Sequence, residues 1–203
     1  MHIYAKSILI LLFIRLKEIR KRPELPKSAF IICSNHSSFI DIPCLYTMFD
    51  FYFTFTGKQE IEKWPLFRIF YTSGMNILVD RHNPKNAVTA MRRMINEIEL
   101  NHPLMIFPEG TITKNAPHMG PFKQGAFQIA IQKQIPIVPV TFLTNFKRLE
   151  RKSFFKAKAS PGISKVIVHD PVSTAGLTKK DMEALQIKVR KIIEAPLFET
   201  TRE

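Results

Sequence analysis

Short apolar runs alternate along this chain with longer stretches that have the residue spacing of amphipathic helices. Runs of three to six residues, rich in Ile, Val and Phe, are typical of buried strands. Strands that alternate with helices predict an α/β fold, here a single-domain αβ sandwich around a largely parallel, mixed sheet of about six or seven strands. The runs lie at residues 29–34, 51–56, 77–80, 103–107, 137–142 and 166–168, and the expected helices lie at 42–49, from 83 onward, at 123–134 and at 178–195.

The first 22 residues are the one part of the chain that we set apart from the main domain, residues 23–203. Residues 7–14 are apolar except for Ser7, and five basic residues follow before position 23. Eight residues are too few to cross a bilayer, which takes about 20 residues, and no signal-peptide cleavage site follows. We expect residues 1–22 to form a helix at a membrane interface, with its basic end near anionic headgroups. A helix packed on the protein's own core is one alternative, and a chain trimmed at its start is another.

The chain carries 30 basic and 17 acidic residues, and the net charge of +13 predicts an anionic partner. Anionic lipid, a phosphorylated substrate or nucleic acid would each fit this charge. We expect no nucleic-acid partner, because the charge comes without zinc-finger spacing, an aromatic–basic RNA-binding string or a Gly-rich clamp loop. Residues 147–165 hold seven of the basic side chains and are interpreted either as a solvated flap or as a surface for anionic lipid.

Three apolar features bear on the surroundings of the chain. Cys33 and Cys44 lie in apolar context without metal-ligand spacing, so we expect buried free thiols, a reducing compartment and no metal site. The aromatic residues of 59–75 are interpreted as ordinary core or as an apolar face for lipid or an acyl chain. Pro139 predicts that its strand lies at an edge of the sheet or contains a bulge, because proline cannot donate to a ladder.

A histidine and an aspartate follow the first apolar run, five positions apart, in the sequence NHSSFID. A neutral imidazole at His36 can take a proton from an alcohol as that alcohol attacks an acyl carbon. A carboxylate at Asp41, bonded to the far ring nitrogen, would fix the tautomer and stabilise the imidazolium. The competing interpretation is a capping box from Ser38 to Asp41 that opens a helix, with His36 merely at its entrance.

Two more polar clusters follow apolar runs, one at Asp80–Arg81 and one at Glu109–Thr111. Sites in open parallel sheets gather beyond the carboxyl ends of the strands, and three polar clusters at three strand ends favour a site over a lone cap. From the residues alone, the chemistry is acyl or phosphoryl transfer on an anionic substrate.

The order of the motifs resembles the glycerolipid acyltransferase family, and in particular the 1-acyl-sn-glycerol-3-phosphate (lysophosphatidate) acyltransferases. The resemblance implies transfer of a fatty acyl group from acyl-CoA or acyl carrier protein to the free hydroxyl of lysophosphatidate, which gives phosphatidate. It implies no cofactor beyond the thioester co-substrate, and an enzyme associated with the cytoplasmic face of a membrane, peripheral or monotopic. The motifs are NHSSFID (35–41), GKQEI (57–61) with ILVDR (77–81), FPEGT (107–111), FKQGAF (122–127) and IPIVPV (135–140).

The resemblance also implies roles for individual residues. It makes His36 the general base and Asp41 its orienting partner. The acceptor positions are Arg81, Glu109, Gly110 and Thr111, Lys58 and Lys123 are further phosphate candidates, and Pro139 belongs to the acyl-donor side.

Elementary chemistry adds three expectations to these roles. Direct attack by the acceptor needs no acyl-enzyme, so we expect Ser37 and Ser38 to be caps and not nucleophiles. Backbone N–H groups near Gly110 and Thr111 are the expected donors to the oxyanion. Glu109 cannot hold a phosphate, so a glycerol hydroxyl, or an ion pair with Arg81 or Lys123, is its expected partner.

One departure from the family pattern keeps the acceptor open. The family commonly has an arginine after FPEGT, and this chain has Ile112. Either Lys114, Lys123 or Lys58 takes over its phosphate, or the acceptor is glycerol-3-phosphate, another lysophospholipid or an amino-lipid. A noncatalytic basic protein that docks on anionic membrane is the alternative from another class.

Overall fold

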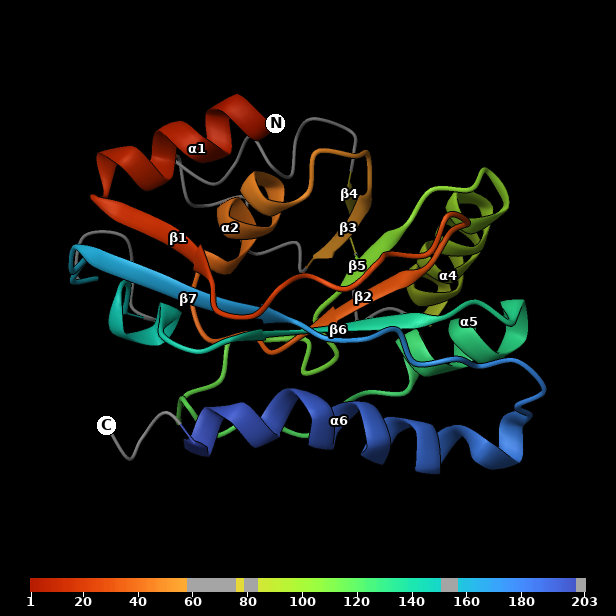
Figure 1. Ribbon diagram of the computed structural model, residues 1–203. Helices are drawn as coiled ribbons and strands as arrows, with labels where there is room; N and C mark the ends of the chain where they lie inside the picture. The colour runs from red at the N-terminus through yellow and green to blue at the C-terminus, as the bar shows by residue number, and fades with distance from the viewer. Residues whose placement is uncertain (58–75, 79–83, 151–156, 200–203) are drawn as a thin grey trace.

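A seven-stranded sheet forms the middle layer of the computed structural model, which describes residues 1–57, 76–78, 84–150 and 157–199 (Figure 1). The strand order is β1-β7-β6-β2-β5-β3-β4. The strands are β1 Ile14–Glu18, β2 Ile31–Ser34, β3 Thr54–Gly57, β4 Asn76–Leu78, β5 Leu104–Ile106, β6 Ile137–Phe142 and β7 Gly162–Val168. The helices are α1 His2–Leu11, α2 Asp41–Met48, α4 Pro84–Glu99, α5 Gly125–Lys133 and α6 Met182–Glu199, with short 3-10 turns η2 Asn145–Lys147 and η3 Lys179–Asp181.

Most of the sheet is parallel. Strands β6, β2, β5, β3 and β4 run in one direction, whereas β1 and β7 pair in parallel with each other and antiparallel to β6. The predicted α/β sandwich around a largely parallel, mixed sheet is therefore confirmed. Because the five parallel strands share one direction, the segments that follow β2, β5 and β6 emerge at the same edge.

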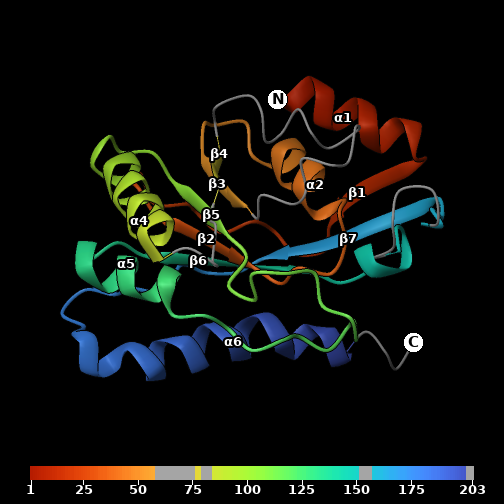
Figure 2. The same ribbon diagram turned by 180° about the vertical axis from the view of Figure 1, so that it is seen from behind.

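Helices cover both faces of the sheet (Figures 1 and 2). Helices α1 and α2 lie on one face, and α4, α5 and α6 lie on the other. Alternate residues of β2 enter the two layers: Ile32 packs in the first core, Ile31 and Cys33 in the second. The central strands β2 and β6 are buried along their whole length, which explains their continuous apolar sequence.

The N-terminal element differs from the helix expected over residues 1–22. Helix α1 ends at Leu11, and β1 begins at Ile14 and pairs with β7 in the sheet. The prediction of one helix is wrong here because residues 14–18 alternate between the core and solvent with the period of two that a strand requires. Two of the basic side chains expected on a helix, Arg15 and Lys17, are instead exposed on this edge strand.

Helix α1 buries one side against α2 and leaves another side in solvent. Ala5, Ile8 and Leu9 are in the core, so this face packs on the protein itself, as one alternative anticipated. Ile3 and Ile10 are exposed on the other side. In the described part of the chain, no helix is both long enough and apolar enough to span a bilayer.

Pro139 was predicted to mark either an edge or a bulge. Strand β6 lies inside the sheet, between β2 and β7, so the edge is wrong, but the ladder opposite Pro139 does contain an irregularity. The ladder with β7 covers only Val140–Phe142, and the backbone N–H of His169 donates to Pro139 O. Val140 pairs with Val168 and Ile137 pairs with Val172, so the opposing chain has one more residue than β6 between these two pairs. Pro139, which lacks an N–H, therefore faces an irregular part of the ladder.

Two further strands have different limits from those expected. Strand β3 begins at Thr54, because the aromatic rings of residues 51 and 53 pack against Phe49 before the ladder starts. Strand β7 begins at Gly162, so the carboxyl end of the expected 147–165 flap belongs to the sheet.

Candidate active site

The two residues of the expected dyad are hydrogen-bonded to each other at the carboxyl end of β2. His36 Nδ1 lies 2.9 Å from Asp41 Oδ2, and the two residues are 5% and 0% exposed. Asp41 Oδ2 also accepts the backbone N–H groups of Ser37 and Ser38, at 2.8 and 2.9 Å. Asp41 Oδ2 thus acts as a hydrogen-bond acceptor toward both serines. The hydrogen in its bond with the imidazole therefore comes from His36 Nδ1. Nε2 then has a lone pair, and no described residue hydrogen-bonds to it.

Asp41 also starts helix α2, so the dyad and the helix start share one carboxylate. It bonds the backbone N–H groups that precede the helix, as the acid of a capping box does. Of the two serines expected to cap, Ser38 accepts the backbone N–H of Ile40, the residue before α2, in a long bond of 3.4 Å, whereas Ser37 does not cap. Ser38 Oγ donates to Leu149 O at 2.8 Å, and Ser37 Oγ is buried without a partner among the described residues.

The imidazole ring lies flat against Phe107, the residue that follows β5. The ring centroids are 3.8 Å apart and the planes differ by 1°. The carbonyl of His36 accepts the backbone N–H of Thr113 at 2.9 Å. Stacking fixes the ring plane and the Asp41 bond fixes its rotation, so the direction of Nε2 is set before any substrate binds.

Glu109 connects two backbone segments. Its Oε1 accepts the His36 backbone N–H at 2.8 Å, and its Oε2 accepts the Gly120 N–H at 2.7 Å. Both oxygens are therefore used within the protein, and Glu109 is 4% exposed. The expected ion pair with Lys123 is wrong, because Lys123 is exposed and only its backbone N–H bonds nearby, to Pro108 O.

Burial dominates the electrostatics of Glu109. Burial raises the pKa of its carboxyl from 4.5 to about 7, the two backbone N–H groups and the Arg190 charge oppose the rise, and the Asp41 charge adds to it. The Arg190 guanidinium is itself held by the carbonyl of Met119, at 3.1 Å, and by that of Gly120. A side chain placed on Gly120 would put its Cβ 3.3 Å from Glu109 Oε2, so glycine gives this acceptor the room it needs.

The Gly110–Thr111 segment only partly matches its expected role. Gly110 has a φ of 71°, which favours glycine, and its N–H donates to Phe107 O at 2.9 Å. That N–H closes a turn, so its expected role as an oxyanion donor is wrong. The N–H of Thr111 bonds to no described residue, and its role as an oxyanion donor stays a prediction.

The structure describes only some of the other expected site residues. Lys58 and Arg81 fall outside the described residues. Pro139 is buried in β6 and pairs with Cys33, three residues before His36. At the departure from the family pattern, Ile112 is buried at 5% exposure, whereas Lys114 is exposed.

Three residues at the site had no role in the sequence prediction, although Asn35 belongs to the NHSSFID motif. Asn35 continues the β2–β6 ladder with its side chain: its Nδ2 donates to Phe142 O at 3.0 Å, and its Oδ1 accepts the Phe142 N–H at 2.8 Å. Asn145 Nδ2 donates to Asp41 Oδ1 at 2.7 Å, and Ser164 bonds Asn145. The strand-end rule, applied to β6, would have identified residues 143–145.

The described residues contain no cluster of three or more His, Cys, Asp or Glu side chains that could hold a metal ion. Cys33 and Cys44 are free and buried, as expected. Burial raises the pKa of the Cys44 thiol to about 12, so it stays a neutral thiol beside the site.

The raised pKa of Glu109 makes a prediction about stability. The folded chain holds the Glu109 proton more tightly than the unfolded chain does. The free energy of unfolding should therefore fall by on the order of 2–3 kcal/mol as pH rises from about 4.5 to 7. Glu109→Gln cannot titrate, so its free energy of unfolding should fall less than that of the wild type between pH 5 and pH 8. Urea unfolding followed by circular dichroism at both pH values measures this difference.

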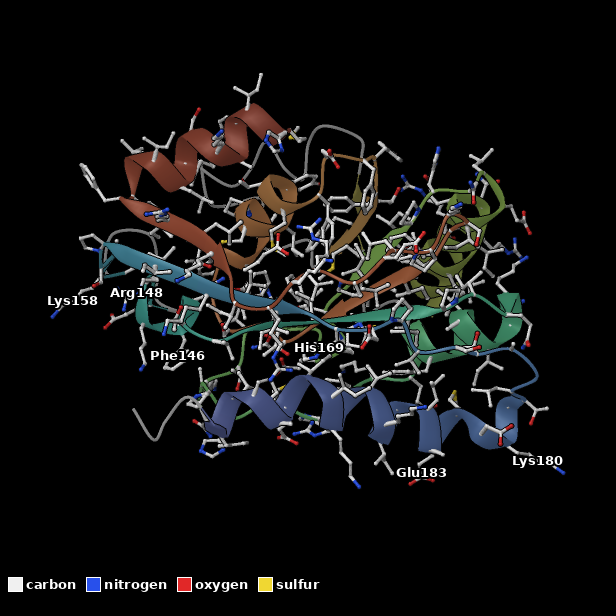
Figure 3. The ribbon with its side chains drawn as sticks, in the orientation of Figure 1. Phe146, Arg148, Lys158, His169, Lys180 and Glu183 are labelled. Atoms are coloured by element: carbon white, nitrogen blue, oxygen red, sulfur yellow. The ribbon has the colours of Figure 1, made fainter. Side chains whose placement is uncertain are left out.

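The matched control is Glu183→Gln, which removes an exposed carboxylate on α6 (Figure 3). Its pH dependence should equal that of the wild type. Parallel curves for Glu109→Gln and the wild type would contradict the proton affinity that we give to Glu109.

Comparison with known proteins places the chain in a family. A family model described as Acyltransferase matches residues 14–143. The chain is 33% identical over 162 residues to human 1-acyl-sn-glycerol-3-phosphate acyltransferase beta, covering 76% of this chain and 55% of the relative. It is 32% identical over 168 residues to the 1-acyl-sn-glycerol-3-phosphate acyltransferase of Saccharomyces cerevisiae, covering 82% of this chain and 54% of the relative. The chain spans about half the length of the curated relatives it matches.

A solved structure supports the fold. The crystal structure of the 1-acyl-sn-glycerophosphate (LPA) acyltransferase PlsC from Thermotoga maritima matches with a TM-score of 0.79 and 23% sequence identity, over 100% of this chain and 78% of that one. The family model covers well over half of the chain and includes the motifs that carry His36, Asp41 and Glu109. The chain therefore belongs to the acyltransferase family.

Proposed function

We propose that this protein transfers a fatty acyl group from a thioester to the free hydroxyl of lysophosphatidate, which gives phosphatidate. One observation carries the proposal: His36 and Asp41 form a buried, hydrogen-bonded pair, and this bond leaves Nε2 of His36 as the proton acceptor. The curated relatives are named for this reaction on 1-acyl-sn-glycerol-3-phosphate. The acyl donor of the proposal is acyl-CoA or acyl carrier protein.

The reaction proceeds by direct attack. His36 Nε2 takes the proton of the acceptor hydroxyl while the hydroxyl oxygen attacks the thioester carbon and the carbonyl electrons move to its oxygen. The tetrahedral intermediate collapses, the C–S bond breaks, and the proton on Nε2 passes to the leaving thiolate. Such general-base assistance is typically worth about 10²–10⁴ in rate.

The described contacts favour this route over an acyl-enzyme. The hydroxyl closest in sequence to the base, Ser37 Oγ, has no hydrogen bond to His36, and Ser38 Oγ donates to a carbonyl instead. A serine nucleophile needs a base within hydrogen-bond reach. The role of Asp41 is to hold Nδ1–H and to stabilise the imidazolium that forms during attack.

The phosphate of the acceptor is held by cations. Arg81 and Lys58 keep this role from the family resemblance. Lys114 and Lys123 are exposed in the segment that follows Glu109, so they are the candidate phosphate ligands from the described part of the chain. The buried Ile112 keeps glycerol-3-phosphate, another lysophospholipid and an amino-lipid as alternative acceptors.

The N-terminal ridge, which we define as Ile3, Ile10, Leu11 and Phe13, rests in the membrane interface in this proposal. These side chains are 66–82% exposed. The exposed basic residues of β1 follow directly, where they would meet anionic headgroups at the cytoplasmic face. Lys158 and Arg148 lie at the same end of the molecule (Figure 3).

The activity test compares two histidines that have the same kind of partner. His36→Ala should lower kcat at least 100-fold, because the base is lost. The control is His102→Ala, since His102 also bonds a carboxylate at 2.9 Å, that of Glu97. This variant should keep wild-type kcat, because His102 lies on the surface after α4. Product formation is measured by mass spectrometry with acyl-CoA and a panel of the four acceptor classes.

Full activity in His36→Ala would contradict the role of His36 as the general base. A wild type that acylates none of the acceptors, but binds anionic vesicles, would instead favour the noncatalytic docking protein.

The N-terminal ridge makes a separate prediction. Leu11→Glu and Phe13→Glu should each weaken binding to vesicles that contain anionic lipid about 10-fold, because each removes an apolar side chain from the interface and adds a negative charge. Co-sedimentation measures the binding. The control, Val88→Glu, changes a residue that is 54% exposed on α4 and should bind as the wild type does. Equal binding by all three variants would exclude the ridge as the attachment surface.

A further inference from the structure

The Asp41 carboxylate receives donors from two parts of the fold. Its Oδ2 accepts three N–H groups, all from residues 36–38 immediately before α2. Its Oδ1 accepts one, from Asn145 Nδ2 at 2.7 Å. Among the described residues, Asn145 is the only hydrogen-bond donor to Oδ1. It comes from η2, 104 residues further along the chain, after β6.

The side-chain amide of Asn145 is itself oriented. Ser164 Oγ donates to Asn145 Oδ1 at 2.5 Å, which turns the NH₂ group toward Asp41. Cys44 Sγ lies 3.4 Å from Ser164 Oγ and 3.8 Å from Asn145 Nδ2, so α2 closes the other side. Asn145, Ser164 and Asp41 are each 0% exposed, so water does not replace any of these bonds.

A buried carboxylate oxygen without a donor is unfavourable. Without Asn145, Asp41 would relieve this by rotating its carboxylate, so that both oxygens share the donors before α2. That rotation would move Oδ2 away from His36 Nδ1 and weaken their hydrogen bond. The imidazole ring would then be free to turn, and the direction of Nε2 would no longer be fixed.

We propose that Asn145, oriented by Ser164, is a positioning residue that holds the Asp41 carboxylate in line with His36. The inference rests on the proposed function, because its main readout is acyl transfer. It assigns a role to two residues outside the family motifs, one on η2 and one on β7. Both act through Asp41 and touch neither substrate.

The first test separates orientation from binding. Asn145→Ala should lower kcat about 10- to 100-fold, because a base displaced by a fraction of an ångström loses its alignment. The KM for the acceptor should change less than about twofold. The control, Thr174→Val, removes a buried hydroxyl whose bonds, to Ala130 O and Ile135 O, lie away from Asp41. It should lose thermal stability and keep kcat.

The second test asks whether Ser164 acts through Asn145. Ser164→Ala should lower kcat about 3- to 10-fold, since the amide can still donate but is free to turn. The double variant should be no slower than Asn145→Ala alone. Additive losses, or a wild-type kcat in Asn145→Ala, would overturn the proposal.

The third test uses Asn145→Asp, which keeps the shape of the side chain. Two carboxylates this close share one proton, and the protonated carboxyl that the substitution introduces donates to Asp41 as the amide does. The titratable groups around this position are Asp41, His36 and Cys44, with Glu109 beyond His36. In kcat/KM, the variant should show an alkaline limb that the wild type lacks, while circular dichroism shows that it stays folded. A profile parallel to that of the wild type would contradict the role.

Failure of the proposed function is distinguishable from failure of this inference. If the wild type makes no product, the Nδ1 proton of His36, read as a low-field proton NMR signal, reports the same positioning without turnover. The signal should be present in the wild type and in Thr174→Val, and lost in Asn145→Ala. Its persistence in Asn145→Ala would overturn the proposal.

Discussion

The hydrogen bond between His36 and Asp41 depends on a carboxylate that two parts of the fold hold in place. One oxygen faces the segment between β2 and α2, and the other faces the turn after β6. Because β2 and β6 are neighbours in the sheet, their carboxyl ends deliver both sets of donors to one point. The register of this strand pair, which the Asn35 side chain extends by one residue, therefore sets the geometry of the base.

A second buried carboxylate fixes the backbone beneath the same imidazole. Glu109 accepts N–H groups from His36 and from Gly120, and so joins the segments after β2 and β5. The two acidic residues serve different purposes: Asp41 orients the ring, whereas Glu109 holds the main chain that carries it. Glu109 is a residue of the FPEGT motif, and both of its carboxyl oxygens accept backbone N–H groups.

The sequence predicted the parts of the structure that depend on local pattern. The alternation of apolar runs and helices predicted the sheet, and the polar residues at strand ends predicted that His36, Asp41 and Glu109 would meet. Asn145 was missed because it belongs to no motif and contacts Asp41 from 104 residues further along the chain. Ser164 was missed because it reaches Asp41 only through Asn145. The bonds of Glu109 were missed because their donors are backbone N–H groups, which have no sequence signature.

Local pattern also misled where two patterns overlapped. Residues 7–14 are apolar enough for a helix, and the strand that begins at Ile14 was hidden in the basic run that follows. Pro139 obeyed the rule that proline avoids a regular ladder, but the irregularity lies in the opposing chain, so β6 can be central. In both cases pairing with a distant strand, β7, decided the outcome.

The claim on which this account depends is that Asp41 keeps the proton of His36 on Nδ1 and leaves Nε2 as the acceptor. Nitrogen-15 NMR of the imidazole at neutral pH measures this directly. The account predicts a protonated-type shift for Nδ1 and an unprotonated-type shift for Nε2 in the wild type, with this preference lost in Asp41→Ala. A wild-type spectrum with the proton on Nε2 would contradict it.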